Sequence, residues 1–446
     1  MLSRREFLGS SVAMGSAGIV APILNVRASD TANLPKYRAL VCIGLGGGAD
    51  SFNMLVPTGR RSYRNYIERR GNLALDHNEL LQLSGAVNTG DSYALHYGLQ
   101  ELHHLYAAGD VALVANVGAL QYPQGKISRA RNTSPSHAQL IARWQLGTTD
   151  LLARNGWAGR FADLAANYGW QDHRQTNISM TGRNLMQLGR YSVATAFPAK
   201  PYQSRVSSPV GVDFSYVGEQ LLERALERER SWSFRRKLHL MEEAETDSLK
   251  IVEDAITDVP RFTNPFSADS FSADLERVAK VISIREKLGV RRQIFYVHFN
   301  GWDHHHQLLD SQAKMLPILS QGLAAFRDAL IEHNVFDDVA TFTISEFGRA
   351  LGSNGSGSDH GWGGHQFAMG GGINGGKIFG EYPDIAKDSP LDIGDGSFVP
   401  TTSVDEYLAE MLLWLGTPLS ELEYVLPDIY KFWKPGNKHA PLGLFT

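Results

Sequence analysis

Four segments of the chain are apolar almost throughout instead of alternating between apolar and polar residues. They are "ALVCIGL" (39–45), "VALVANV" (111–117), "IFYVHF" (294–299) and "VATFTI" (339–344). Strands with this pattern are buried on both faces, which is typical of parallel sheets covered by helices. Because helical patterns alternate with these segments, we predict an α/β fold with a doubly wound, mostly parallel sheet flanked by helices.

The helical patterns carry recognisable end signals. Gly109 and Gly416 directly follow helical repeats and are suited to end helices in the left-handed conformation. Ser403 and Glu406 have the spacing of a capping box, so a helix should begin there. Pro317 lies inside a long helical pattern and predicts a bend.

Polar residues stand at the ends of the predicted strands. Asp50 follows the first strand, and Asn116 lies near the end of the second. Asp303 follows the third strand, and Ser345 and Glu346 follow the fourth. Ligands of open α/β sheets bind beyond the carboxyl ends of the strands. We therefore expect these side chains to gather along one edge of the sheet.

The N-terminal segment, 1–28, has the features of an export signal. Arg4 and Arg5 precede an apolar stretch and then small residues, and "SRREFLG" has the twin-arginine form. This route exports folded proteins through the twin-arginine translocation machinery, often with a cofactor already bound. We expect cleavage after Ala28, a periplasmic or extracellular protein, and no stable membrane span after cleavage. A short membrane anchor is the alternative interpretation.

The rest of the chain, 29–446, is predicted to form a single domain. Between about 155 and 290 the strand pattern gives way to charged helical stretches and to loops rich in Ser, Thr, Gly and Pro. We interpret this segment as a cap or insertion of mixed structure. The formal net charge is −4 at pH 7, without a basic block, which argues against nucleic-acid binding. Cys42 is the single cysteine, so no intramolecular disulfide can form.

The glycine-rich stretch "GLGGGADSFN" (44–53) allows three interpretations. It satisfies the short dinucleotide-binding fingerprint, but that motif needs a helix directly after the glycines, and Pro57 and Gly59 prevent a long one. It could instead carry Asp50 as a carboxylate ligand on a loop that allows close backbone approach. A purely structural loop with a capping aspartate is the third possibility.

The stretch "TSPSHAQLIARWQLG" (133–147) predicts a helix that begins near 134–136. A hydroxyl at such a terminus can act as a nucleophile, because backbone N–H groups and the helix dipole favour developing negative charge. The candidates are Thr133, Ser134 and Ser136, with His137 beside them. These residues could equally serve only as helix caps.

Histidines and carboxylates concentrate in two later segments. "GWDHHHQL" (301–308) places Asp303 before His304, His305 and His306, and neighbouring residues of an extended chain point to opposite sides. The glycine-dense stretch 344–372 carries Glu346, Arg349, Asp359, His360 and His365. Such a loop is costly to order without a ligand, and Asp and His are good donors for divalent metals.

Several motifs in combination resemble a known family. The chain carries a twin-arginine start, "GGGADSFNMLVP", "GWAGR", "GWDHH", "SEFGR", "DHGWGGH", "GGGINGG" and "VPTTSVDEY". Together these are similar to the bacterial exported family called domain of unknown function 1501, over almost the whole mature chain. That family looks like a branch of the alkaline phosphatase-like superfamily of phosphatases and sulfatases. The resemblance implies an alkaline phosphatase-like core, a metal site at the strand ends and a hydroxyl nucleophile at a helix N-terminus.

The resemblance also implies roles for individual residues. Ser136 and His137 match the Ser-His pair of the family, and Thr133 stands where sulfatases place their nucleophile. The implied metal ligands are Asp50, Asp303, His305, Glu346, Asp359, His360 and His365. The chain departs from the superfamily pattern at Gln307, where a histidine is usual, and at Glu346–Phe347, which replace an Asp-His pair.

The expected function is an exported, metal-dependent hydrolase of a phosphate or sulfate ester, on a small molecule or a polymer. One or two divalent ions, zinc, manganese or calcium, would be bound. A non-catalytic exported protein that keeps the fold for binding or assembly is the alternative. A dinucleotide-dependent oxidoreductase is the third hypothesis.

Overall fold

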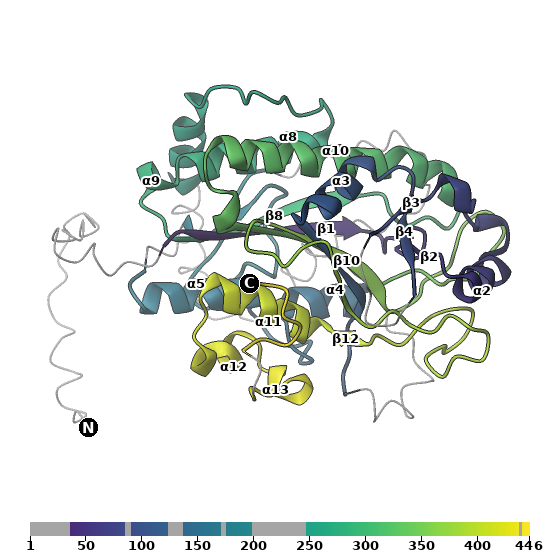
Figure 1. Cartoon of the computed structure of the whole chain (residues 1–446). Coiled ribbons are helices and arrows are strands. Elements are labelled where there is room, and N and C mark those ends of the chain that lie inside the picture. The colour runs from purple at the N-terminus through teal and green to yellow at the C-terminus, as the bar shows by residue number, and fades with distance from the viewer. Residues whose placement is uncertain (1–35, 85–90, 124–136, 171–174, 199–246, 437–438) are drawn as a thin grey trace, which may run out of the picture. The chain divides into compact units, whose positions relative to one another are not determined.

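A computed structural model describes residues 36–84, 91–123, 137–170, 175–198, 247–436 and 439–446 (Figure 1). Its main sheet has nine strands in the order β11-β5-β10-β9-β1-β8-β6-β7, with β12 also paired to β5. Only β10 runs antiparallel to its neighbours among these described pairings. The strands are β1 (Arg38–Gly46), β5 (Val111–Gly118), β6 (Asn177–Ser179), β7 (Thr195–Ala196), β8 (Arg292–Asn300), β9 (Val339–Ser345), β10 (Gly364–Met369), β11 (Ile378–Gly380) and β12 (Thr402–Ser403).

The predicted α/β fold with a mostly parallel sheet is confirmed, because the four apolar segments form β1, β5, β8 and β9. The central strand β1 lies between β8 and β9 and is paired in parallel with both. Strand β10 was not predicted from the sequence. It lies inside the glycine-rich stretch 344–372, where flanking glycines hide a short strand pattern.

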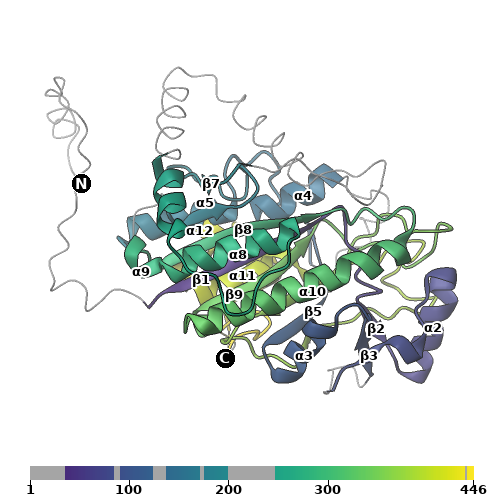
Figure 2. The same cartoon turned by 90° about the horizontal axis from the view of Figure 1, so that it is seen from above.

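Helices cover both faces of the sheet. On one face lie α3 (Gln100–Ala108), α8 (Ser270–Ser283) and α10 (Leu308–Glu332), and on the other α4 (His137–Leu146), α5 (Trp157–Asn167) and α11 (Val404–Leu415) (Figures 1 and 2). Alternate residues of β1 enter the two cores. Val41 and Ile43 pack with α8 and α10, whereas Leu40 and Cys42 pack with α5 and α11. This burial on both faces explains why the strand is apolar throughout.

Shorter elements complete the described chain. A small sheet contains β2 (Leu55–Pro57), β3 (Leu81–Gln82) and β4 (Tyr93–Leu95). Further helices are α2 (Arg60–Arg70), η2 (Gly71–Leu73), η3 (His77–Glu79), α9 (Arg285–Leu288), η6 (Phe336–Asp338), η7 (Leu419–Glu421), α12 (Leu422–Val425) and α13 (Ile429–Phe432), and residues 247–257 are helical as well.

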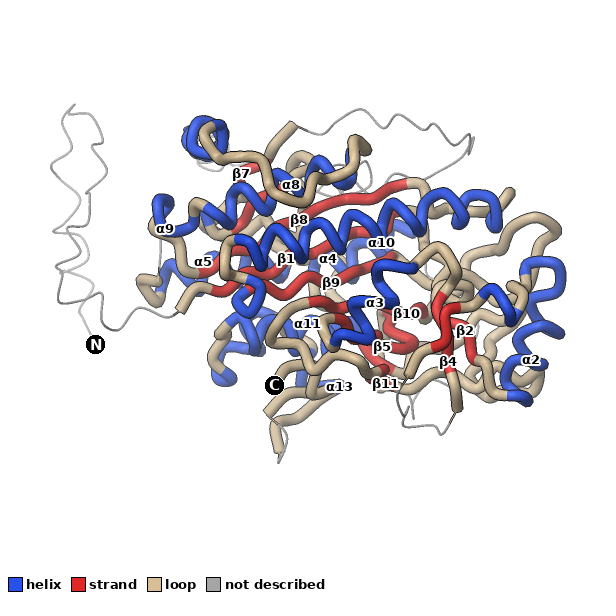
Figure 3. Tube along the Cα trace, turned by 45° about the horizontal axis from the view of Figure 1, so that its top comes forward, coloured by secondary structure: helices blue, strands red, loops and turns tan. Residues whose placement is uncertain are grey.

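The predicted helix ends are present. The Ser403 hydroxyl accepts from the Glu406 N–H, and the Glu406 carboxylate accepts from the Ser403 N–H, which completes the capping box of α11. Gly109 and Gly416 are left-handed at the ends of α3 and α11. Pro317 lies inside α10, which continues as one helix on both sides of it (Figure 3).

The segment 155–290 contributes to the layered core where it is described. Strands β6 and β7 extend the main sheet beyond β8, while α5 and α8 cover opposite faces. Residues 199–246, in the middle of the expected insertion, lie outside the described residues, as does the expected signal at 1–28. Across the described ranges, no helix combines the length and the apolar character needed to span a membrane.

Candidate metal centre

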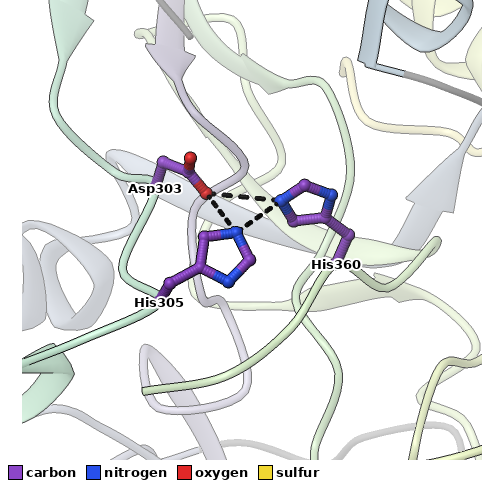
Figure 4. Close-up of side chains that lie close together, drawn as sticks. All are labelled: Asp303, His305 and His360. Carbon is purple, nitrogen blue, oxygen red and sulfur yellow. Dashed lines mark hydrogen bonds and ion pairs between the residues drawn. The ribbon is translucent and has the colours of Figure 1, made fainter. Parts of the chain in front are cut away.

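Three predicted ligands come together at the carboxyl edge of the sheet. The ends of β1, β8 and β9 lie level, since Gly46 pairs with Asn300 and Leu45 with Ser345. The chain after β8 carries Asp303 and His305, and the chain after β9 folds back so that His360 forms a bridge with Arg349. The side chains of Asp303, His305 and His360 point toward one another (Figure 4), and their donor atoms all lie within 4.8 Å of one another.

The three donor atoms lie close to one another, and Asp303 Oδ1 also accepts a hydrogen bond from Arg349 Nη1 at 2.7 Å. His305 Nε2 lies 3.2 Å and His360 Nε2 3.4 Å from Asp303 Oδ1, and the two ring nitrogens are 2.7 Å apart. A tetrahedral zinc ion with bonds of about 2.0–2.1 Å keeps its ligand atoms about 3.3–3.5 Å apart. The two contacts to Asp303 already match this spacing, and the rings need to separate by about 0.6 Å. The donor set therefore fits one divalent cation.

Asp359 supports this arrangement from the other side of the His305 ring. Its Oδ1 lies 3.3 Å from His305 Nδ1 and accepts from Asn354 Nδ2 at 2.9 Å. A proton held on Nδ1 by this contact leaves the Nε2 lone pair free for a metal. Carboxylates commonly orient metal-binding histidines in this way. Asp359 therefore orients the His305 ring and is not one of the three clustered donors.

The protonation states suit a metal ligand set. Burial by itself raises the pKa of Asp303, but hydrogen bonds from His360 and Arg349 and the Arg349 charge hold it at about 2. Burial and the Arg349 charge lower the pKa of His305. At neutral pH the Asp303 carboxylate is therefore ionised and the His305 ring neutral, as metal binding requires. Both histidine side chains are about one-third exposed, so the centre is open to solvent.

Arg349 is the residue that orders this corner of the molecule. Its side chain is fully buried, and Nη1 donates to Asp303 Oδ1 at 2.7 Å and to the Gly47 carbonyl at 3.2 Å. Its Nε donates to the Ser358 carbonyl at 2.9 Å. One guanidinium thereby joins the loops after β1, β8 and β9. Phe347 packs beside His360, with ring centroids 4.6 Å apart, and forms an apolar wall.

The glycine-rich loop after β1 serves close packing. Gly47 and Gly48 have positive φ angles of 115° and 79°. A Cβ on Gly47 would lie 2.5 Å from the Asp303 backbone nitrogen, and one on Gly48 would overlap the Phe347 ring. Only glycine combines this backbone conformation with such close approach.

The same loop does not have the form of a dinucleotide site. The next helix, α2, begins only at Arg60, so no helix N-terminus follows the glycines. The Gly47 N–H donates to the Glu346 carboxylate, and the Ala49 N–H donates to Ser345 Oγ at 2.9 Å. These N–H groups already bind protein side chains, whereas a pyrophosphate cradle needs them free. The structure therefore contradicts the dinucleotide interpretation.

Three further predicted ligands lie outside the cluster of donors and have other partners. Asp50 is fully buried and forms an ion pair with Arg70. Glu346 is buried, and its pKa is raised to about 8 by burial, although hydrogen bonds from Gly47 and Gly48 act in the opposite direction. His365 Nδ1 accepts from the Asn116 N–H at 3.1 Å, and burial lowers the pKa of its ring to about 3.

Simple alternation would place His304 and His306 on the same side of the chain, but the structure separates them. His304 is buried, and His306 is exposed. Thr133, Ser134 and Ser136, the proposed nucleophiles, lie outside the described residues. Helix α4 begins at His137, directly after Ser136 in the sequence.

Sequence reasoning missed two arginines. Arg349 was noticed only as part of a polar loop, and Arg70 was not singled out. Nothing in "IERRGNL" marks Arg70 as a partner of a residue twenty positions earlier. The contact arises because the end of α2 folds back beneath the loop after β1. The Asp50–Arg70 pair can be recognised only in the three-dimensional structure, where both charged side chains are completely buried.

The fold and the site define an α/β protein with a candidate centre for one metal ion at the carboxyl edge of its sheet. Residues 221–419 match the model of a family described as "Protein of unknown function (DUF1501)". This match confirms the resemblance expected from the motifs over those residues, which are less than half of the chain, whereas the motifs had suggested a resemblance over almost the whole mature chain. No curated protein matches the sequence.

Solved structures similar to this chain include a synthase, a sulfatase and a phosphatase, all at low identity. The lipoteichoic acid synthase LtaP from Listeria monocytogenes is 9% identical, with a TM-score of 0.39, over 89% of this chain and 76% of that chain. The PsFucS1 sulfatase from Pseudoalteromonas sp. is 10% identical, with a TM-score of 0.36, over 88% and 70%. The alkaline phosphatase from the Antarctic bacterium TAB5 is 11% identical, with a TM-score of 0.29, over 77% and 94%.

Proposed function

We propose that this protein is an exported, metal-dependent hydrolase of phosphate or sulfate esters. The observation that carries the proposal is the convergence of Asp303, His305 and His360 at the carboxyl edge of the sheet, with one face open to solvent. A bound divalent cation would polarise an ester oxygen and stabilise the charge that develops on it. Zinc suits two imidazoles and a carboxylate best, and manganese is the next choice.

The chain's own residues supply the rest of the proposed chemistry. Arg349 and Asp359 hold Asp303 and His305 in place, so that little reorganisation is needed when a ligand binds. Ser136, or less favourably Thr133, is the proposed nucleophile, with His137 beside it. The support for Ser136 is its position directly before the first residue of α4, where helix N–H groups favour a developing negative charge.

Elemental analysis and an ester screen test this proposal. We expect the purified mature protein to retain zinc or manganese, and to hydrolyse an aryl phosphate or aryl sulfate. Asp303→Asn should lose the metal and reduce hydrolysis by about 100-fold or more, because it removes the only carboxylate among the three donors. His306→Asn is the matched control, since that neighbouring side chain is exposed.

A non-catalytic binding protein is the second candidate, favoured by the absence of Asp50 from the cluster of donors. It predicts that metal binds normally while no ester is cleaved. If the wild type cleaves an ester, Ser136→Ala should abolish that cleavage while leaving metal binding unchanged. A real hydrolytic activity that survives both Ser136→Ala and Asp303→Asn would show that neither residue carries it.

Export to the periplasm or beyond forms the remaining part of the proposal. It rests on the twin-arginine pattern of 1–28. Replacement of Arg4 and Arg5 by lysine should retain the protein in the cytoplasm, as followed by fractionation. Unchanged export of that variant would exclude the twin-arginine route.

A further inference from the structure

Asp50 is the predicted metal ligand whose surroundings differ most from a metal site. Its side chain is completely buried, and Oδ2 accepts from Arg70 Nη2 and from Ser358 Oγ at 3.3 Å. Its Oδ1 accepts weakly from the Asn53 N–H at 3.4 Å. All of these partners are hydrogen-bond donors, and none is a metal-binding group.

Arg70 is held as firmly as the carboxylate it neutralises. Its side chain is also completely buried, and Nε donates to Asn53 Oδ1 at 2.9 Å. Its Nη1 donates to the carbonyl oxygens of Ala350 and Leu351, each at 3.1 Å. The guanidinium is therefore committed to four protein acceptors and is not directed toward a substrate.

A divalent ion at Asp50 would face strong opposition. It would lie against the Arg70 guanidinium, just as an ion at Asp303 would lie against Arg349. The two sites differ because two imidazole nitrogens lie 3.2 and 3.4 Å from Asp303 Oδ1, whereas no described imidazole hydrogen-bonds to Asp50. Displacing Arg70 would leave its buried charge, two backbone carbonyl oxygens and Asn53 Oδ1 without their partners, which is costly. Within the described ranges, the only group of three metal-binding donors is Asp303, His305 and His360, and Asp50 is not in it.

The two buried aspartates at this edge are thus treated differently. Asp303 shares its carboxylate between Arg349 and two imidazoles that can bind a cation. Asp50 forms its hydrogen bonds with Arg70, Ser358 and Asn53, whereas the nearby imidazoles of His96 and His304 interact with it electrostatically and donate no hydrogen bond to it. Ser358 connects the two pairs, because its hydroxyl donates to Asp50 while its carbonyl accepts from Arg349.

We infer that Arg70 takes the place of a second metal ion, so that the chain binds a single divalent cation, at Asp303, His305 and His360, and none at Asp50. This inference rests on the proposed metal centre and chooses between the one and two ions that the sequence left open. The positive charge beside Asp50 is part of the chain and cannot be removed by a chelator.

Counting bound ions in the wild-type protein tests the inference without depending on any variant. The mature protein is stripped with a chelator, titrated with zinc or manganese by calorimetry, and analysed for metal after desalting. We expect one ion per chain. Two ions per chain would overturn the inference while leaving the proposed metal centre standing. No bound ion would overturn both.

A matched pair of variants then locates the ion. Asp303→Asn should weaken binding by more than about 100-fold, beyond the usual effect of residues that only orient a ligand. Asp50→Asn should still bind one ion, with affinity changed by less than about tenfold, because the charge removed was already neutralised by Arg70. Loss of the ion in folded Asp50→Asn would place it at Asp50 and refute the inference.

The double variant Asp50→Leu with Arg70→Met covers the case in which Asp50→Asn does not fold. Replacing both members of a buried ion pair by apolar residues is often tolerated, whereas removing one leaves an unpaired charge. This variant should also bind one ion, as checked by the same titration after circular dichroism has shown it to be folded. A folded double variant without metal would contradict the inference.

Discussion

At the scale of single residues, burial at the sheet edge changes how acids and histidines titrate. Glu346 directly follows β9 and is buried, and its pKa is raised to about 8. His365 lies between Phe52 and Tyr382, with ring centroids 5.0 Å and 4.6 Å away, and its pKa is lowered to about 3. Both shifts arise mainly because burial disfavours the charged form of each group.

Glu346→Gln should flatten the alkaline part of the stability profile. The pKa of Glu346 is higher in the folded state than in the unfolded state. Its contribution to stability is therefore fully present below about pH 4.5 and is lost as the pH rises toward 8. Between pH 5 and 8.5 the free energy of unfolding of the wild type should fall by on the order of 2–4 kcal/mol more than that of the variant. Urea unfolding of chelator-treated protein measures this, and parallel profiles would refute it.

His365→Asn should weaken the acid dependence of stability. The folded pKa is depressed, so below about pH 6.5 the unfolded chain gains a proton that the folded ring does not, and stability falls. Asparagine keeps an acceptor for the Asn116 N–H but loses ring packing. The variant should therefore be about 2 kcal/mol less stable at pH 7, yet lose less stability on going to pH 5.

The same variant distinguishes a structural from a metal-binding role. We expect His365→Asn to retain the bound ion, because His365 is outside the cluster of three donors. Loss of metal from the folded variant, measured by elemental analysis, would make His365 a ligand.

At the scale of elements, the site depends on how closely three strand-end loops approach one another. The loop after β1 passes Asp303 and Phe347 at positions where only glycine fits. The Arg349 side chain hydrogen-bonds to the Gly47 carbonyl of that loop and to groups in the loops after β8 and β9. The precision of the centre therefore comes from backbone contacts between loops as much as from the ligands.

Gly48→Ala should be destabilising by about 3 kcal/mol or more, because the added methyl overlaps the Phe347 ring and φ is +79°. It should also weaken metal binding, since Phe347 packs on His360. Gly169→Ala is the matched control, with φ of +68° and nothing within 4 Å of the added carbon. It should cost only about 1–2 kcal/mol, as left-handed backbone does for alanine. If chemical denaturation showed the same loss of stability for Gly48→Ala and Gly169→Ala, the close packing against Phe347 would contribute nothing to stability.

At the scale of the whole molecule, metal binding at this centre would be coupled to folding, because its donors come from two loops, after β8 and after β9, that only the fold brings together. Zinc at about 100 times its dissociation constant should stabilise the protein by about 2.7 kcal/mol. Chelation should lower the melting temperature by a few degrees, and zinc should restore it. Asp303→Asn should show no such response in thermal scans, whereas His306→Asn should respond like the wild type.

Much of the architecture could be predicted from local patterns. The four buried strands, the capping box of α11 and the glycine ends of α3 and α11 all depend on residues near one another in sequence. Strand β10 could not be predicted because its six residues, which lie in a glycine-rich stretch, are too few to show a clear hydrophobic pattern. The gathering of Asp303, His305 and His360 was also expected, since parallel strands deliver their ends to one edge.

The sequence by itself determined the alternation of buried strands and helices, and it determined which residues stand where those strands end. Tertiary structure alone decided how the carboxylates are used. Asp50 and Asp303 look equivalent in sequence and each pairs with a buried arginine, yet only Asp303 also contacts two imidazoles that can share a cation. The physical reason is that a buried charge is governed by whichever partner the fold brings within a few ångströms, and local sequence carries no record of that partner.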